Sequence, residues 1–326
     1  MRGEGVGLNH PKPQDDARGT MKTNAEISRR QWLQSVLAFG TLGGCSGWRV
    51  GSGNPRFSNE ERFAPATVSA LKAKTTVFVL QPGDGGELDS FRSLLRQAWT
   101  MTPLEVVMPD QVDQFKDSKR YQYFTVDTFY NINGLPEQYG LVLVDALGES
   151  DNLQGYCRYP LSKVQQLEGA GPKARQYYNW HPSTLALYLR SIQCDLESGL
   201  RRAMYEEKSE RTRLLSVKEH TLYIPDYALT PDERSPELQN ANPSEVFAQY
   251  PYHYQVVDPR ALGDLLGPEF AREKSSVLAL DCAFTGKERF VTVYSPAGGV
   301  IYRRNSRFGA TLTRGDIAEL LKSVGA

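Results

Sequence analysis

The residue types that most often carry catalysis are sparse in this chain, and their spacing fits neither metal binding nor a nucleophile. Histidine occurs only four times. The three histidines after residue 60 are His181, His220 and His253, and no two are four residues apart, the spacing that puts two ligands on one helix face. The sequence contains no C-x-x-C pair and no G-x-S-x-G elbow. We therefore expect no metal and no other cofactor, and we assign no catalytic residue.

A glycine-rich turn and three aspartates occupy places where α/β enzymes often carry their chemistry. Gly83-Asp84-Gly85-Gly86 lies between an apolar run and an amphipathic one, where a phosphate-binding loop would lie. Its spacing matches no nucleotide-binding fingerprint and its neighbours are acidic, so a turn that opens a helix explains the same residues. Asp127, Asp145 and Asp281 end or interrupt apolar runs, where an aspartate either acts in a site or caps the next segment.

Two aromatic clusters are the best candidates for a binding surface. Residues 177–181 and 250–254 combine rings with polar tips, a composition suited to sugars, peptides or protein surfaces. The predicted surface consists of Tyr177, Tyr178, Trp180, Tyr252 and Tyr254. It requires Trp180 and at least one of these tyrosines to be exposed near one another. The alternative is that the rings belong to the core and their polar tips bond to backbone.

The charge balance excludes one class of partner. The chain of 326 residues has 38 Lys+Arg and 38 Asp+Glu, so it lacks the basic excess typical of nucleic-acid binding. Its 40% of hydrophobic residues is typical of a globular protein with a sizeable core. We expect no nucleic-acid partner.

The segment from Ser28 to Cys45 has the three parts of an export signal. A basic pair is followed by a short apolar run, residues 36–42, and then by the small residues Gly43 and Gly44. The run is much shorter than the ~20 residues that span a bilayer. An ordinary helix that ends at the two glycines is the alternative.

Two motifs in this segment resemble known bacterial signals. Four residues, Arg29, Arg30, Trp32 and Leu33, resemble the twin-arginine export motif. Leu42-Gly43-Gly44-Cys45 resembles a lipobox, which implies that Cys45 becomes the acylated first residue of the mature chain. Because both motifs occur in the right order and at the right distance, they favour export and lipid anchoring over the ordinary helix.

These signals divide the chain into four parts. Residues 1–44 are predicted to be a leader and signal peptide, in which Met21 is a second candidate start and residues 1–20 are either a misassigned beginning or a dispensable leader. Residues 45–70 begin with a stretch rich in Ser, Gly and Asn, and are predicted to be a lipidated tether. The folded part then comprises an N-terminal half, residues 71–215, and a C-terminal half, residues 216–326.

The pattern of apolar residues in the two halves predicts an α/β fold with a mixed sheet. Strand patterns alternate with helix patterns, and a hairpin plus a helix end the chain. The predicted strands cover residues 75–80, 104–108, 121–129, 141–147, 222–225, 252–257, 277–284, 290–295 and 300–304. The predicted helices cover residues 88–99, 110–115, 181–211, 243–249, 259–266 and 314–324, the longest of them linking the halves.

The two halves are predicted to be similar β-α-β-α-β units. In each half a proline precedes a short strand and an aspartate follows the proline by seven residues, Pro103 with Asp110 and Pro251 with Asp258. This suggests a duplication, although local preferences also place proline before strands and aspartate before helices.

The mature chain as a whole resembles α/β lipoproteins of bacterial envelopes that have no assigned activity. The resemblance rests on the signal and on the hairpin from Val291 to Tyr302 beside the final helix, and it carries no catalytic motif. The export signal, the tether and the aromatic clusters together favour a non-catalytic module, anchored to a membrane and facing the periplasm or the cell surface, that binds an envelope protein or a cell-wall component. The rival hypothesis is an exported enzyme that folds before twin-arginine translocation with a cofactor inside.

Overall fold

The structure is a computed structural model that describes residues 61–62, 64–130, 136–144, 156–163, 177–201, 208–229, 242–285, 288–307 and 311–325. The predicted export signal and Cys45 lie outside these residues. Among the described residues, no helix combines the length and apolar character that crossing a bilayer needs.

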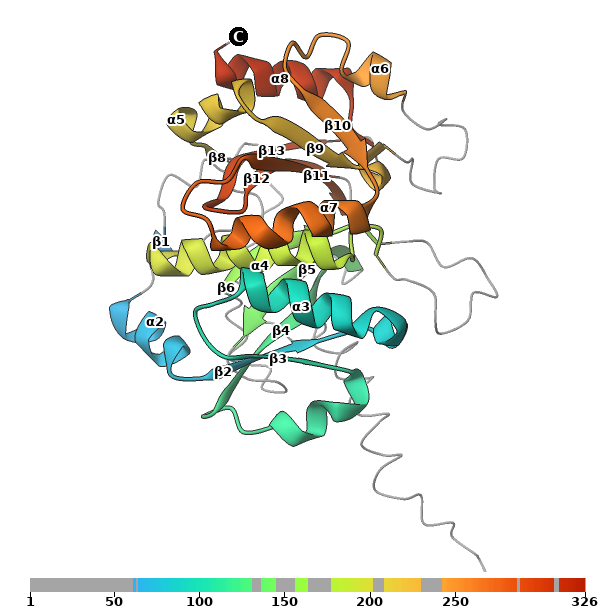
Figure 1. Ribbon diagram of the computed structural model, residues 1–326. Coiled ribbons are helices and arrows are strands. Elements are labelled where there is room, and N and C mark those ends of the chain that lie inside the picture. The colour runs from blue at the N-terminus through green and yellow to red at the C-terminus, as the bar shows by residue number, and fades with distance from the viewer. Residues whose placement is uncertain are drawn as a thin grey trace, which may run out of the picture.

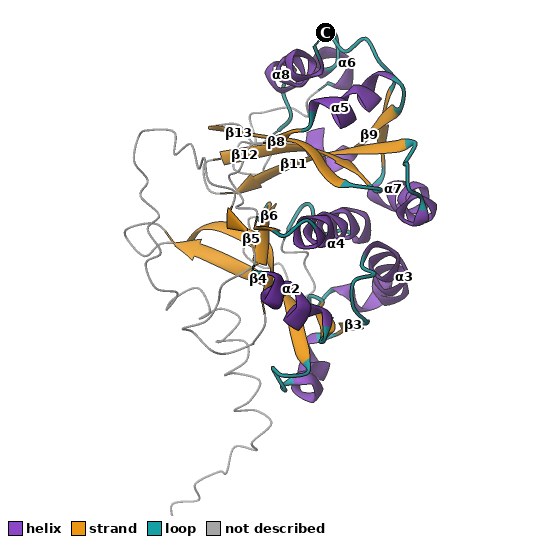
Figure 2. Cartoon of the chain, turned by 90° about the vertical axis from the view of Figure 1, so that its left-hand side faces the viewer, coloured by secondary structure: helices purple, strands orange, loops and turns teal. Residues whose placement is uncertain are grey.

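Four layers of secondary structure are stacked on one another (Figure 1). The first sheet has the strand order β3-β2-β4-β5-β6, and the second has the order β10-β9-β11-β12-β13-β8. A layer of helices, α3, α4 and α7, lies between the sheets, and α5, α6 and α8 cover the outer face of the second sheet (Figures 1 and 2). The first sheet consists of β2 (Thr75–Val79), β3 (Leu104–Val107), β4 (Tyr121–Tyr130), β5 (Pro136–Val144) and β6 (Tyr156–Leu161). The second consists of β8 (Lys208–Ser209), β9 (Thr221–Pro225), β10 (Tyr254–Val257), β11 (Val277–Thr285), β12 (Glu288–Ser295) and β13 (Gly299–Arg307).

The helices follow the amphipathic patterns of the sequence. The α-helices are α2 (Pro65–Lys72), α3 (Leu88–Ala98), α4 (Pro182–Glu197), α5 (Arg211–Leu214), α6 (Pro243–Val246), α7 (Pro259–Leu266) and α8 (Arg314–Val324). Short 3-10 segments are η1 (Asp84–Glu87), η2 (Pro109–Phe115), η3 (Leu215–Lys218), η4 (Asp226–Leu229) and η5 (Gly267–Ala271). A small separate ladder pairs β1 (Glu61–Arg62) with β7 (Leu200–Arg201). The mixed α/β class is confirmed.

The two halves share one topology, as the sequence predicts. In the first sheet β2 runs parallel to both β3 and β4, and β5 and β6 then continue antiparallel. In the second sheet β9 runs parallel to both β10 and β11, and β12 and β13 continue antiparallel. Pro103 and Pro251 precede equivalent strands, β3 and β10. The halves form two sheets rather than the single mixed sheet expected, because the helices of both halves pack between them.

The parallel strands have apolar residues on both faces because both faces are covered. In β2, Phe78 packs toward α3 and α4, whereas Val77 packs into a smaller cluster on the opposite face together with Val112 of η2. In β11, eight of the nine residues are buried. Continuous apolar runs of this kind are typical of strands buried between layers.

Helix α4 is buried on nearly all sides, since it packs against α3 and α7 and against strands of both sheets. Leu185, Leu189, Ile192 and Leu196 form one fully buried stripe along this helix, but most residues on its other faces are buried too. The prediction that this helix continues to residue 211 was wrong. It ends at Glu197, and Gly199 then adopts a φ of 68°, the left-handed conformation in which glycine commonly ends a helix.

The hairpin of β12 and β13 lies close against α4. Gly299 has a φ of 70°, and a Cβ at this position would lie 3.0 Å from the Cα of Ser191. Arg190 of α4 donates from Nε to the carbonyl of Pro296 in the same turn, over 3.0 Å. Glycine is therefore required here both by the backbone conformation and by the approach of the helix.

Two predicted boundaries differ from the observed elements. The predicted tether extends to residue 70, yet β1 begins at Glu61 and α2 at Pro65. The predicted division at residue 215 assigns β8 and α5 to the first half, yet β8 pairs with β13 and α5 packs against α8. Among the described residues, the second layered unit therefore begins with β8 at Lys208.

Candidate functional site

The first aromatic cluster belongs to the core, so the expectation that Trp180 is exposed was wrong. Trp180 is 1% exposed and Tyr177 is 5% exposed. The indole ring lies 5.8 Å from Phe78 and 6.0 Å from Tyr177, measured between ring centroids. Its Nε1 donates to Asp84 Oδ2 over 2.8 Å, which places the glycine-rich turn against the core and gives Asp84 a structural role.

The second aromatic cluster is partly exposed. Tyr252 and Tyr254 are partly buried, whereas Tyr250 is only 7% exposed. Tyr254 stacks on Phe247 with ring centroids 4.3 Å apart, and Tyr250 meets Tyr252 edge to face at 5.5 Å. This group borders the hydrophobic cluster under α8, whereas Tyr177 and Trp180 pack in the cluster around α4. The predicted binding residues therefore do not form one surface.

The most concentrated buried polar group surrounds Asp281, an acid in the middle of apolar β11. Tyr227 of η4 donates to Asp281 Oδ1 over 2.9 Å, and the hydroxyl of Tyr188 in α4 lies 2.5 Å from Oδ2. Asn179 donates from Nδ2 to the Tyr188 hydroxyl over 2.8 Å and to the carbonyl of Pro160 over 3.1 Å. These residues, Asn179, Tyr188, Tyr227 and Asp281, are called the Asp281 cluster below.

The hydroxyl of Tyr188 lies near two acceptors, Asp281 Oδ2 at 2.5 Å and the Pro160 carbonyl at 2.9 Å. Asn179 also donates to that carbonyl, so the carbonyl has a donor whether or not Tyr188 bonds to it. The hydrogen bonds are therefore satisfied with Asp281 either ionised or protonated. Burial raises the pKa of Asp281 above its usual value, and this outweighs the opposing effects of Tyr188, Tyr227, Asn179 and Arg303.

A buried arginine lies on the same face of the sheet. The strand register places Asp281, Thr292 and Arg303 in one row across β11, β12 and β13. Arg303 is 1% exposed, and its guanidinium carbon lies 4.5 Å from the centroid of the Tyr159 ring, a cation–π contact. Two strand spacings, roughly 10 Å, separate the backbone of Arg303 from that of Asp281. The charge of Arg303 lowers the pKa of Asp281 less than burial raises it.

Of the four residues of the Asp281 cluster, Tyr227 is the one that is partly exposed. This phenol also shares a hydrogen bond of 2.8 Å with Thr184, and its ring stacks on partly exposed His181 with centroids 5.6 Å apart. Burial, together with the neighbouring Asp281, raises the pKa of both Tyr188 and Tyr227 well above the usual value. The arrangement holds a proton in place and joins α4, η4 and β11.

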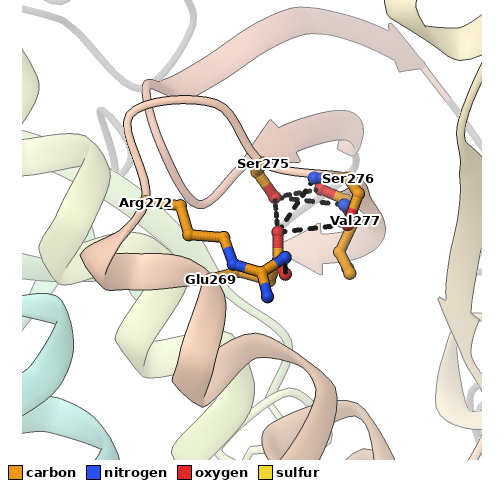
Figure 3. Close-up of polar contacts among 5 residues, drawn as sticks. All are labelled: Glu269, Arg272, Ser275, Ser276 and Val277. Atoms are coloured by element: carbon orange, nitrogen blue, oxygen red, sulfur yellow. Dashed lines mark hydrogen bonds and ion pairs between the residues drawn. The ribbon is translucent and has the colours of Figure 1, made fainter.

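A second buried carboxylate, Glu269 of η5, fixes the turn that leads into β11 (Figure 3). Its Oε2 accepts from Ser275 Oγ over 3.0 Å and from Ser276 N over 2.8 Å. Arg272 donates from Nη1 to the other oxygen over 2.5 Å. All of these partners lie within seven residues of Glu269, so the group is a local clamp on a turn and not a site that faces a ligand.

Cys282 is buried in the hydrophobic cluster under α8. Across the described ranges, no group of three or more His, Cys, Asp or Glu residues is placed to hold a metal ion.

The sequence singled out Asp281 as an acid inside the apolar run of residues 277–284, but it did not indicate its partners Asn179, Tyr188 and Tyr227.

No protein-family model matches the chain, and neither a curated protein nor a solved structure shows significant similarity to it.

The placement of the two aromatic clusters predicts different effects of truncation. Trp180→Ala removes a fully buried ring and the partner of Asp84, so it should lower the free energy of unfolding by ~3–5 kcal/mol. Tyr252→Ala, at a partly exposed ring, should lower it by about 1 kcal/mol. Urea denaturation of the two variants measures the difference. Equal losses would contradict the assignment of Trp180 to the core.

The raised pKa of Asp281 predicts a pH-dependent stability. Between the unfolded value of about 3.9 and the higher folded pKa, the folded state binds more protons, so stability falls as pH rises, by up to about 1.4 kcal/mol per pH unit. Asp281→Asn cannot titrate and should lack this component. Urea denaturation at several pH values should therefore give a flatter profile than the parent. The matched control is Asp264→Asn, at an exposed position on α7, which should keep the parent slope. An unchanged slope in D281N would contradict a raised pKa of Asp281.

Proposed function

We propose that the protein is a lipid-anchored module of a bacterial envelope that binds an envelope protein or a cell-wall component without catalysing a reaction. One observation carries the proposal, the succession of Arg29-Arg30, a short apolar run and Leu42-Gly43-Gly44-Cys45 ahead of the folded part. In this proposal the translocase exports the chain and a lipid on Cys45 holds it at the membrane.

The distance from Cys45 to the first described strand is compatible with a tether. Residues 46–60 separate Cys45 from β1, which begins at Glu61. At ~3.3–3.6 Å per residue, these residues can extend over at most about 50 Å. Such a reach would let the folded layers contact a partner above the lipid headgroups.

The interior of the folded part supports binding in preference to catalysis. Asp281 is the acid best placed in a strand for chemistry, and α4 and η4 enclose it through Tyr188 and Tyr227. A general acid or nucleophile must reach its substrate within hydrogen-bond distance. A carboxyl group enclosed in this way fits a role in holding layers together.

The exported enzyme remains the second candidate, and the position of His181 favours it. This partly exposed histidine stacks on Tyr227, which bonds directly to Asp281. A small movement of the ring pair would open a path from the surface to the acid. A stoichiometric chromophore or metal in the protein purified from the envelope would favour this candidate over the binding module.

Lipid anchoring predicts the location of a variant without the thiol. Cys45→Ala removes the group that is acylated, so the protein should move from the membrane fraction to the soluble fraction after a high-salt wash. Immunoblots of the separated fractions measure this. The matched control, Ser46→Ala, keeps the thiol and should stay in the membrane fraction. Sedimentation of C45A with membranes like the parent would refute lipid anchoring at this residue.

Twin-arginine export predicts sensitivity to a change that preserves charge. Arg29→Lys combined with Arg30→Lys keeps both positive charges but replaces the planar guanidinium groups with ammonium groups, so export should stop and the precursor should accumulate in the cytoplasm. Protease protection in spheroplasts reports which side of the membrane the protein occupies. Arg49→Lys, outside the motif, is the control. Normal export of the double variant would indicate the general secretory route.

A further inference from the structure

The outer edge of the first sheet is closed by side chains. The carbonyls of Pro103, just before β3, and of Val107, its last residue, accept hydrogen bonds from the side of β2. Because backbone groups alternate along a strand, the carbonyls of Leu104 and Val106 point away from the sheet. Arg96 donates from Nε to Leu104 O over 3.1 Å, and Arg92 donates to Val106 O over 3.4 Å. Charged side chains that occupy edge carbonyls prevent another strand from pairing there.

At the topologically equivalent edge of the second sheet, no side chain of the described residues bonds to the outward backbone groups. Leu222 N donates to His253 O over 3.0 Å, and the parallel register then directs the backbone of Gln255 toward β9. The N–H and C=O groups of Tyr254 and Val256 therefore point outward. β10 is thus an edge strand whose outward groups have no hydrogen-bond partner among the described residues, at the right of the second sheet in Figure 1.

We propose that two copies of the chain pair through β10, antiparallel about a two-fold axis, so that their six-stranded sheets become continuous. Because Tyr254 and Val256 carry the outward groups, they must form the hydrogen-bonded pairs, Tyr254 of each copy opposite Val256 of the other. Gln255 then lies opposite Gln255 on the axis, as a non-hydrogen-bonded pair.

The side chains of β10 fit this self-pairing. Tyr254 opposite Val256 is an aromatic and β-branched pair, one of the favourable cross-strand combinations. Gln255 is exposed on the other face, and two facing amides can each donate and accept. The register continues with His253 opposite Val257 and Tyr252 opposite Asp258, so no like charges oppose one another.

The ring of Tyr254 is already fixed in place for such a contact. Phe247 stacks on it at 4.3 Å, and Tyr250 lies edge to face with it at 6.1 Å. A side chain held in this way loses little rotamer freedom when it is buried by a partner. In the dimer, the partly exposed tyrosines of the second aromatic cluster therefore contact the same cluster of the second copy.

Charged substitutions of Gln255, the residue on the two-fold axis, test the proposal. The full chain with Cys45→Ala, which removes the lipidated thiol, should sediment in analytical ultracentrifugation with a concentration-dependent mass approaching twice 36.5 kDa. Gln255→Lys or Gln255→Glu places like charges opposite each other and should weaken self-association about tenfold or more. An equimolar mixture of the two variants should restore it as a heterodimer. Exposed Gln255 is not needed for folding, so the variants should melt like the parent.

A proline gives an independent test at the backbone. Val256→Pro removes an N–H that points away from β9, so the β9–β10 ladder should survive while pairing between copies is lost. Val256→Thr keeps the N–H and the branched side chain and should still self-associate. A parent that stays monomeric at high micromolar concentration would overturn the proposal, as would a charge mixture no more associated than either variant alone. Association of V256P equal to that of V256T would place the interface elsewhere.

Discussion

The burial of α4 is the constraint on which the rest of the structure depends. A helix buried on nearly all sides must find most of its polar partners inside the protein. Ser191 donates to the carbonyl of Leu187 one turn earlier in the same helix. Two other side chains bond to residues outside the helix, since Gln193 accepts from the backbone of Thr100 over 2.8 Å and Tyr188 reaches Asp281 of β11. The bonds of Gln193 and Tyr188 therefore fix the rotation of α4 between the two sheets.

A carboxyl group can join several segments because each of its oxygens takes part in hydrogen bonds. Asp281 accepts from Tyr227 at one oxygen, and its other oxygen lies 2.5 Å from the Tyr188 hydroxyl. Tyr188 in turn lies 2.9 Å from the carbonyl of Pro160. The cluster therefore couples α4, η4 and β11 by hydrogen bonds inside the core.

Local signals in the sequence predicted much of the fold, while the site depended on contacts between distant residues. α7 and α8 begin and end where the caps and periodicity indicate, with Asp258 and Thr313 capping through their side chains. The length of α4 was overestimated because apolar residues continue the helical period beyond the terminating Gly199. The burial of Trp180 and the enclosure of Asp281 follow from partners about a hundred residues away, Asp84 and Tyr188, which periodicity within one segment cannot reveal.

The position of α4 has a consequence for the order in which the protein can be completed during synthesis. Two of the elements that pack against α4, α3 and β6, precede it in the chain. Three others, α7, β12 and β13, are translated after it. Until Gly299 has left the ribosome and the hairpin has closed against Ser191, the helix keeps an apolar side without cover. The nascent first half therefore exposes an apolar surface of the kind that chaperones bind. Although its topology is repeated in the second half, it is not an independent folding unit.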